Sequence, residues 1–398
     1  MTSLGPHSGV LSPDRLASAR ELFPHTRKGM IFLNHAGTSP LSIRVVKAMQ
    51  EYLSDRSEGK IDTYFSDVPM VAATKAFIAQ IINAESPDRI ALSANTTDAI
   101  NIVATGLPWK SGDRILLNSA EFPANVWPYL HLRRLGVEID SIPSINGVVT
   151  PEMIDSAITP RTKLLGLSAV QFLSGFRSNL DAIGELCRQH NIVFAVDGIQ
   201  AVGAVRLDVQ HLKIDALSAG GEKWQMSPHG TGFLYITEQL QSRAQHAALG
   251  WLAVKEPWEF YNFSQPVATT ARRYEGGSQI MPSLWGMHAA LSTLLEFGTD
   301  AIESHILALT RILCERLRAI PGVTLITPLE NSRRAGIVTV EPPEGLDVGA
   351  ILNALVGRNI HPAVREGKIR YSPHFYNTPD EMETTAAATG ECIDALRR

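Results

Sequence analysis

The amino-acid sequence predicts an α/β fold in which a large domain with a mostly parallel sheet precedes a smaller α+β domain. Between residues 89 and 236, short apolar runs alternate with amphipathic runs, which is typical of a parallel sheet with helices on both faces. This alternation of strand and helix patterns ends at about residue 285, after which two long helical patterns precede short strands and a final helix. The 398 residues, 44% of them hydrophobic, are enough for a large core.

At the N-terminal end we expect a helix, because Ser12 can cap it and Pro13 suits its first position. A short strand, MIFLN, then ends near Asn34, and a second helix follows from about Leu41. We expect residues 1–29 to pack with the small domain.

Six apolar runs in the middle of the chain predict strands of the large sheet. They span residues 89–93, 114–119, 163–170, 191–196, 215–219 and 230–236. Helical patterns such as TDAINIVATGL and NLDAIGELCRQH lie between most of them. The connection into the last strand is too short for a helical crossover, so we expect that strand to run antiparallel.

The last third of the chain predicts the smaller domain. Its helical patterns span residues 281–297 and 302–320, its strands lie near 323–326, 336–341 and 369–372, and its last helix begins near Pro379. We therefore expect a large domain over 30–285 and a small domain over 286–398.

Composition excludes several classes of function. A net charge of −4 gives no reason to expect nucleic acid or an anionic membrane as a partner. The three cysteines are widely spaced, which argues against a disulfide framework or a zinc cluster. No Walker loop, GxGxxG fingerprint or metal-ligand spacing occurs, and we expect no metal. No apolar run approaches the roughly 20 residues of a membrane span, so we expect a cytoplasmic protein.

Three polar motifs follow strands of the predicted sheet, where open α/β sheets bind their ligands. Thr96 and Thr97 stand at a helix start, which can hold an anion or can simply be a helix cap. Asp197 ends an apolar strand, where an acid is costly unless it is paired. Lys223 lies in the turn GGEKW, where a desolvated amine can act as a nucleophile, although a surface lysine is the ordinary alternative.

Together the three motifs indicate one cofactor, pyridoxal 5′-phosphate (PLP). The phosphate of PLP needs an anion cradle, its pyridinium nitrogen needs a carboxylate, and its aldehyde needs a lysine. An anion cradle, a buried acid and a buried amine occur here in that chain order.

The chain resembles the class V aminotransferase family of fold-type I PLP-dependent enzymes between about Asn34 and Thr378. The motifs that carry the resemblance are NHAGTSPL, NTTDAIN, AEFPANVWP, VDGIQAVGA, GGEKWQMSPHGTGFLY, RRYEGGS and IRYSPHFYNT. The resemblance implies the fold-type I transferase architecture, with a mostly parallel seven-stranded sheet in the large domain. It also implies a homodimer with active sites shared across the interface.

By the same resemblance, most cofactor contacts can be assigned. Lys223 resembles the lysine that forms the Schiff base, and Asp197 resembles the partner of the pyridinium nitrogen. Gln200 resembles the donor to the ring hydroxyl, and Thr96 and Thr97 resemble the phosphate-loop pair.

The resemblance also implies roles for residues at the rim of the site. Phe122 stands where a ring stacks on the cofactor, and Gln171 lies near the polar residue that approaches the cofactor's oxygen, to within a residue. Ser278 resembles a phosphate contact donated by the other subunit. Arg370 resembles the arginine that clamps the substrate α-carboxylate. The substrate-side loop is matched more loosely by Asn34, His35 and Ala36.

Departures from the family pattern narrow the range of reactions that we expect. Phe122 replaces the usual histidine of cysteine desulfurases, and Gly220, Gly221 and Glu222 replace their frequent Ser-Gly-His. The segment from Glu341 to residue 370 holds no cysteine, so a persulfide-forming desulfurase is disfavoured.

We therefore expect an aminotransferase-like or C–S lyase-like enzyme for a small amino acid, with Lys223 as the base that takes the Cα proton. A cysteine desulfurase, a selenocysteine lyase or an epimerase of the same family is the alternative. A catalytically silent protein on the same scaffold is a third reading, against which the retained Lys223 and Arg370 argue. The aromatic loop 251–263 fits a substrate pocket or a dimer interface equally, and Arg365 fits a second substrate contact or an exposed charge.

Overall fold

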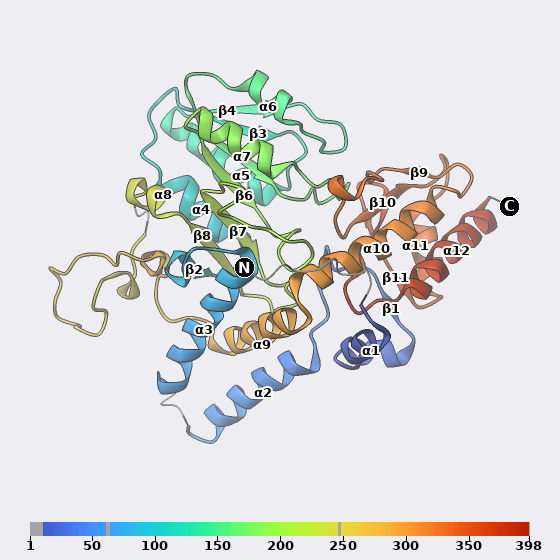
Figure 1. The fold of residues 1–398 in the computed structure, drawn as a ribbon, viewed down its shortest axis with the longest axis horizontal. Coiled ribbons are helices and arrows are strands. Elements are labelled where there is room, and N and C mark those ends of the chain that lie inside the picture. Colours follow the sequence, from blue (N-terminus) through green and yellow to red (C-terminus); the bar gives the residue numbers. More distant parts are fainter. Residues whose placement is uncertain (1–10, 61–63, 246–247, 398) are drawn as a thin grey trace, which may run out of the picture.

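The structure, a computed structural model, describes residues 11–60, 64–245 and 248–397 (Figure 1). Its centre is a seven-stranded sheet with the order β2-β8-β7-β6-β5-β3-β4. The strands are β2 (Ile90–Ser93), β3 (Arg114–Asn118), β4 (Glu138–Ile142), β5 (Thr162–Ser168), β6 (Val193–Asp197), β7 (Ala216–Gly220) and β8 (Gly232–Ile236). Only β8 runs against its neighbours β2 and β7, as predicted from its short connection, and the other pairs in this sheet are parallel.

Strand β4, at one edge of this sheet, was not predicted from the sequence. Its pattern is mostly polar, and only Ile142 is buried. Arg114 of β3 forms ion pairs with Glu138 and Asp140 of β4. The strand is therefore supported by charge pairs with its neighbour, which an apolar pattern cannot reveal.

Both faces of the sheet are covered by helices, which explains the nearly continuous apolar strands. On one face, Ile115, Leu164 and Leu234 cluster with α4 (Thr96–Gly106). On the other, Leu116, Leu165 and Phe233 cluster with α3 (Tyr64–Ile82), α7 (Leu180–Gln189) and α9 (Met281–Phe297). Shorter helices complete this part: α5 (Trp127–Leu130), α6 (Pro151–Ala157) and α8 (Glu238–Arg243).

A second, antiparallel sheet with the order β12-β13-β10-β9 forms the C-terminal part of the chain. Its strands are β9 (Thr324–Leu325), β10 (Val338–Glu341), β12 (Ala363–Arg365) and β13 (Lys368–Tyr371). The helices α10 (Thr299–Leu317), α11 (Val348–Val356) and α12 (Pro379–Leu396) pack on it around a separate apolar cluster. Helix α11 and strand β12 were not predicted from the sequence.

The N-terminal residues contact the C-terminal part. Helix α1 (Pro13–Glu21) is capped by Ser12, and Arg20 forms an ion pair with Glu381 of α12. Strand β1 (Ile31–Phe32) pairs in parallel with β11 (Ile360–His361). Helix α2 (Ile43–Ser57) instead packs on α9.

The division into two domains stays a proposal. Helix α9 packs on α2 and α3, whereas α10 packs on α12. These contacts favour a domain boundary near Gly298, between α9 and α10, rather than at residue 285 as the sequence predicted. No helix in the described part of the chain is long and apolar enough to cross a membrane.

Candidate active site

A cavity of about 300 Å³ lies at the edge of the large sheet where β2, β6 and β7 end. Strand ends and the first turn of α4 contribute much of its wall. Its lining residues are Ala36, Gly37, Asn95, Thr96, Thr97, Phe122, Ala124, Phe172, Asp197, Ile199, Gln200, Glu222, Lys223, Arg365 and Arg370. The three predicted motifs therefore meet in one cavity, as the topology of a parallel sheet requires.

The turn that carries Lys223 begins directly after β7 and is held by backbone hydrogen bonds. Gly221 donates to the carbonyl of Thr231, and Met226 donates to that of Lys223. The ammonium nitrogen of Lys223 lies 5.4 Å from the ring centroid of Phe122. Burial lowers the pKa of Lys223, and the charges of Asp197 and Glu222 oppose this change. A lower pKa makes the neutral, nucleophilic amine more available near neutral pH.

Asp197 ends strand β6 and is 3% exposed. One of its oxygens accepts a hydrogen bond of 2.9 Å from the N–H of Ile199. Burial raises the pKa of Asp197 to about 7, the charge of Glu121 adds to the rise, and that of Lys223 opposes it. A cationic N–H group bound beside this carboxyl would lower its pKa again and stabilise the carboxylate.

The first turn of α4 forms another part of the wall. Asn95, rather than either threonine, caps this helix, since its side chain accepts a hydrogen bond from Asp98 N–H. Thr96 accepts a hydrogen bond of 2.8 Å from Gly220 N–H, and the Thr97 side chain is exposed. The free N–H groups of this turn can therefore bind an anion.

Glu222 also reaches this part of the cavity. A Cβ built on Gly220 would lie 2.5 Å from a carboxylate oxygen of Glu222 and 3.1 Å from the hydroxyl of Thr96. A negative side chain thus lies beside the candidate anion cradle.

Gln200 and Gln171 are less available than the sequence suggests. Gln200 lines the cavity, but its amide donates to the carbonyl of Ala36 and accepts from the indole of Trp224. Gln171 donates to Glu121 at 2.9 Å, and its buried amide oxygen has no hydrogen-bond partner among the described residues. The residue that lines the cavity at this point is Phe172, whose ring meets that of Phe122 edge-on at 5.3 Å.

Glu121, which the sequence analysis did not select, is a buried carboxyl group behind the cavity. It accepts hydrogen bonds from the backbone and hydroxyl of Ser168 and from the amides of Asn125 and Gln171. Burial raises the pKa of Glu121, and these hydrogen bonds oppose the rise. The sequence signal that could have identified Glu121 is its position directly before Phe122, the predicted stacking ring.

Two arginines enter the cavity from the hairpin of β12 and β13. Arg370 is 2% exposed, donates to the carbonyl of Phe172 at 2.7 Å, and keeps a buried Nε without a partner. Burial and the charge of Arg365 lower the pKa of Arg370 to about 10. Arg365 also lines the cavity, but its side chain is exposed, as the alternative of an exposed charge predicted.

The substrate-side loop contributes less than the sequence analysis expected. Ala36 lines the cavity, and the buried amide oxygen of Asn34 has no partner among the described residues. His35 is fully buried, and its two ring nitrogens are within hydrogen-bond distance of the Ser372 carbonyl and the Tyr376 hydroxyl. Its side chain is thus packed in the core and has no free group for a substrate.

Ser278 does not line this cavity within one chain. It lies in a separate hollow of about 690 Å³ that also includes Tyr52, Trp251 and Trp258.

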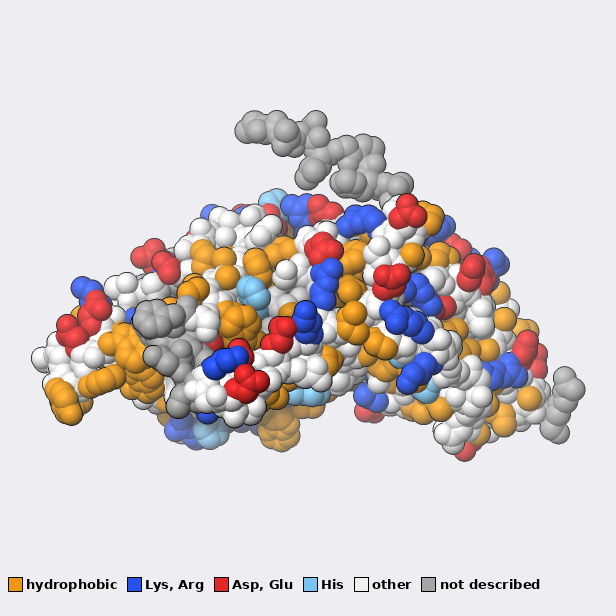
Figure 2. Space-filling model, turned by 90° about the horizontal axis from the view of Figure 1, so that it is seen from below, with side chains coloured by type: hydrophobic (Ala, Val, Ile, Leu, Met, Phe, Trp, Pro, Cys, Tyr) orange, Lys and Arg blue, Asp and Glu red, His pale blue; other side chains and the backbone are white. Residues whose placement is uncertain are grey.

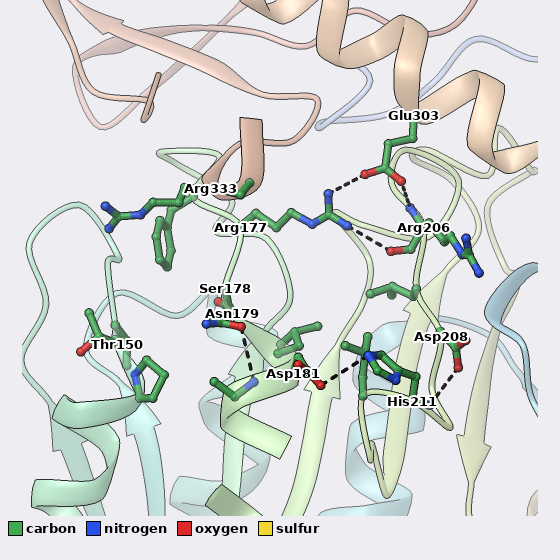
Figure 3. A pocket seen from close by; sticks show the side chains of 18 of the residues that line it. Thr150, Arg177, Ser178, Asn179, Asp181, Arg206, Asp208, His211, Glu303 and Arg333 are labelled. Carbon is green, nitrogen blue, oxygen red and sulfur yellow. Dashed lines mark hydrogen bonds and ion pairs between the residues drawn. The ribbon is translucent and has the colours of Figure 1, made fainter. Parts of the chain in front are cut away.

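A larger cavity, of about 1060 Å³, lies where the loops around Arg177 and Arg206 face α10 (Figure 3). In Figure 3, Arg177 points between Glu303 and the backbone of Arg206, and its guanidinium bonds to both. His211 lies 3.5 Å from Asp181 at its other end. Arg177 is paired with Glu303, and this cavity contains none of the three motifs.

The residues of the 300 Å³ cavity fit PLP. A desolvated amine, a buried acid with a raised pKa and a free helix start match its aldehyde, ring nitrogen and phosphate. Glu222 beside the anion cradle is the one feature that opposes the fit. Among the described residues, no group of three or more His, Cys, Asp or Glu is placed to hold a metal.

Curated relatives align over most of the chain. A probable cysteine desulfurase of Methanothermobacter thermautotrophicus is 27% identical over 89% of this chain and 92% of its own length. The isopenicillin N epimerase of Streptomyces clavuligerus is 28% identical over 92% of this chain and 95% of its own.

Solved structures share the fold. The cysteine desulfurase of Thermococcus onnurineus NA1 has a TM-score of 0.87 at 23% identity, with full coverage of both chains. The cystine C–S lyase C-DES, in complex with its product cysteine persulfide, has a TM-score of 0.85 at 24% identity, covering 93% of this chain and 99% of that one.

The aminotransferase class-V family profile matches residues 31–381, which is nearly the same stretch that carries the motifs. The chain therefore belongs to the class V aminotransferase family of PLP-dependent enzymes.

Proposed function

We propose that this enzyme uses PLP to remove the Cα proton of a small amino acid, and that it catalyses an aminotransferase-like or C–S lyase-like reaction. The observation that carries the proposal is the meeting of Lys223 and Asp197 in one cavity, with pKa values shifted in opposite directions. Pairs of titratable groups whose pKa values are displaced by their surroundings are typical of active sites.

The proposal assigns a role to each wall of the cavity. Lys223 would hold the cofactor's aldehyde carbon, Asp197 its ring nitrogen, and the first turn of α4 with Thr96 and Thr97 its phosphate. Phe122 would cover the ring, and Gln200, through its remaining amide hydrogen, would meet the ring hydroxyl. When bound, PLP supplies an electron-withdrawing ring that lowers the barrier to breaking a bond at Cα.

The protein's own residues then position the substrate and move the proton. Arg370 uses one terminal nitrogen on the carbonyl of Phe172, and its Nε and other terminal nitrogen form no hydrogen bond with the described residues, so that edge of the guanidinium can bind the α-carboxylate bidentately. The neutral amine of Lys223, once free, takes the Cα proton. The ring of Phe122 lies 5.4 Å from this amine, and the ring of Phe172 packs edge-on against Phe122.

A C–S lyase-like or aminotransferase-like outcome is favoured over a desulfurase that forms its own persulfide. All three cysteines are buried, and none lines the cavity. Burial raises the pKa of Cys187 to about 12 and that of Cys314 to about 11, so both thiols are poor nucleophiles.

We further propose a homodimer in which the loop 251–263 and Ser278 face a second subunit. The large side chains of Trp251, Trp258, Phe260, Tyr261 and Phe263 are between 44% and 91% exposed in one chain. Figure 2 shows hydrophobic side chains gathered at the left end of the molecule, which this loop forms in Figure 1. Exposed apolar patches of this kind are typical of protein interfaces.

Borohydride reduction followed by peptide mass analysis tests the cofactor assignment. We expect the purified protein to be yellow and PLP to be fixed on Lys223. Lys223→Ala should abolish the fixed adduct, whereas the control Lys213→Ala should keep it, because Lys213 forms an ion pair with Glu185 away from the cavity. A colourless protein that takes up no PLP would end the proposal.

An amino-acid panel then separates the reactions. Formation of pyridoxamine phosphate would indicate transamination, and pyruvate with sulfide or a persulfide would indicate C–S cleavage. Loss of optical activity without either product would instead support epimerisation and overturn the favoured outcome.

A further inference from the structure

The hairpin of β12 and β13 brings two guanidinium groups to the candidate active site. Ala363 pairs with Arg370, and Arg365 pairs with Lys368, so these four side chains stand on one face of the hairpin. Glu366 and Gly367 have positive φ angles of 48° and 70°, as a tight two-residue hairpin turn requires. This turn fixes where Arg365 stands relative to Arg370.

Both arginines face the same cavity and lack acidic partners. Each lines the cavity, and neither forms an ion pair with any residue that the structure describes. The charge of Arg365 adds to burial in lowering the pKa of Arg370, and it contributes a smaller lowering to the pKa of Lys223. Lys368, on the same face, is paired with Glu341 at 3.6 Å and does not line the cavity.

Each of the two guanidinium groups has N–H donors that form no hydrogen bond with the described residues. Arg370 uses one terminal nitrogen on the carbonyl of Phe172, and its Nε has no partner. Arg365 uses one terminal nitrogen on the carbonyl of Val364 at 2.8 Å. Since Arg370 can hold one carboxylate through its free edge, Arg365 is left to hold a second anionic group.

Neither of the two acidic residues that line the cavity, Asp197 and Glu222, is within ion-pair distance of Arg365. Asp197 lies at the end of β6 and is assigned to the cofactor's ring nitrogen in the proposed function. Glu222 lies near Thr96 and Gly220, at the candidate phosphate cradle. A bound molecule with two negative groups would complete the charge balance of the hairpin.

We infer that the substrate is an amino acid with a second carboxylate in its side chain, and that Arg365 selects it by binding that carboxylate. This inference rests on the proposed function, in which Arg370 holds the α-carboxylate. Arg365 is thereby a specificity-determining residue and takes no part in the proton transfer. Neutral side chains of equal length would lack this ion pair and leave the exposed guanidinium of Arg365 to water.

Binding of unreactive carboxylates to the PLP-loaded protein tests the inference without turnover. Succinate and glutarate are compared with butyrate and valerate by calorimetry and by the shift of the cofactor's absorbance. We expect dicarboxylates to bind about two- to fivefold more tightly, as for an ion pair with an exposed guanidinium. Arg365→Gln should remove this preference, and the matched control Lys368→Gln, which removes a cation from the same hairpin face, should keep it.

Other results would overturn the inference. These are equal binding of mono- and dicarboxylates, or a preference that persists in Arg365→Gln. If Arg365→Gln instead weakens PLP binding and leaves the preference intact, Arg365 serves the phosphate and not the substrate.

The same titrations without PLP distinguish the two proposals. A protein that takes up no PLP but prefers dicarboxylates through Arg365 would overturn the proposed function and keep the diacid site. A yellow protein without any dicarboxylate preference would overturn only the diacid site.

Discussion

Replacement of Asp197 by asparagine should change how the stability of the PLP-free protein depends on pH. In the folded protein burial raises the pKa of Asp197 from 3.8 to about 7. The folded state therefore binds this proton more tightly than the unfolded state does. The stability that results is fully present below pH 4 and is lost as the pH rises through 7.

The expected magnitude follows from these two pKa values. Linkage gives a loss of about 2–3 kcal/mol in the free energy of unfolding between pH 5 and pH 8 for this carboxyl group alone. Asparagine has a similar shape and no charge, so Asp197→Asn should lack this loss. Other titrating groups are common to both proteins, so the difference between the two proteins isolates the contribution of residue 197.

Urea unfolding of both PLP-free proteins at pH 5 and pH 8 measures the effect. We expect Asp197→Asn to gain about 2–3 kcal/mol relative to the wild type on going from pH 5 to pH 8. A difference that stays constant across this range would refute the reasoning, because Asp197 would then titrate near its ordinary pKa. The coupled amine of Lys223 is checked by repeating the pair in a Lys223→Met background.

Three further substitutions test the packing and charges around the site. Gly336→Ala should cost about 1–3 kcal/mol by thermal or urea unfolding, because a Cβ there would overlap the buried ring of Trp224. Gly390→Ala is its control inside α12, where the nearest atom is 3.7 Å away, and should be neutral or stabilising; equal losses would contradict the packing argument. Glu222→Gln should tighten PLP binding about three- to tenfold in a fluorescence titration, because a carboxylate beside the phosphate cradle repels the phosphate; weaker binding would mean that Glu222 aids the cofactor. Glu121→Ala should cost about 3–5 kcal/mol, because several buried donors lose their acceptor, and a loss below about 1 kcal/mol would contradict that role.

Hydrogen bonds beside the cavity join the large sheet to the C-terminal sheet. The carbonyl groups of residues 172–174, in the loop after β5, accept hydrogen bonds from side chains of the C-terminal part of the chain. Thr327 and Thr339 bond to the carbonyls of Ser174 and Leu173, and Arg370 bonds to that of Phe172. Substrate held by Arg370 would therefore be positioned by the same contacts that join the sheets.

The sequence by itself determined six of the seven strands of the large sheet and the polar residues near the ends of three of them. Runs of apolar residues report burial on both faces of a sheet, and a short connection excludes a parallel crossover, as for β8. Thr96, Asp197 and Lys223 could be found because each stands at or within three residues of the end of a strand, and parallel strand ends share one edge.

Only the tertiary structure decided how the other polar side chains are used. His35 bonds to Ser372 and Tyr376, and Gln171 bonds to Glu121, all through contacts between residues far apart in the chain. Arg365 reaches the cavity because of its hairpin register, which one-dimensional periodicity does not contain. Local patterns encode burial, whereas hydrogen-bond partners and charge neighbours depend on how distant segments pack.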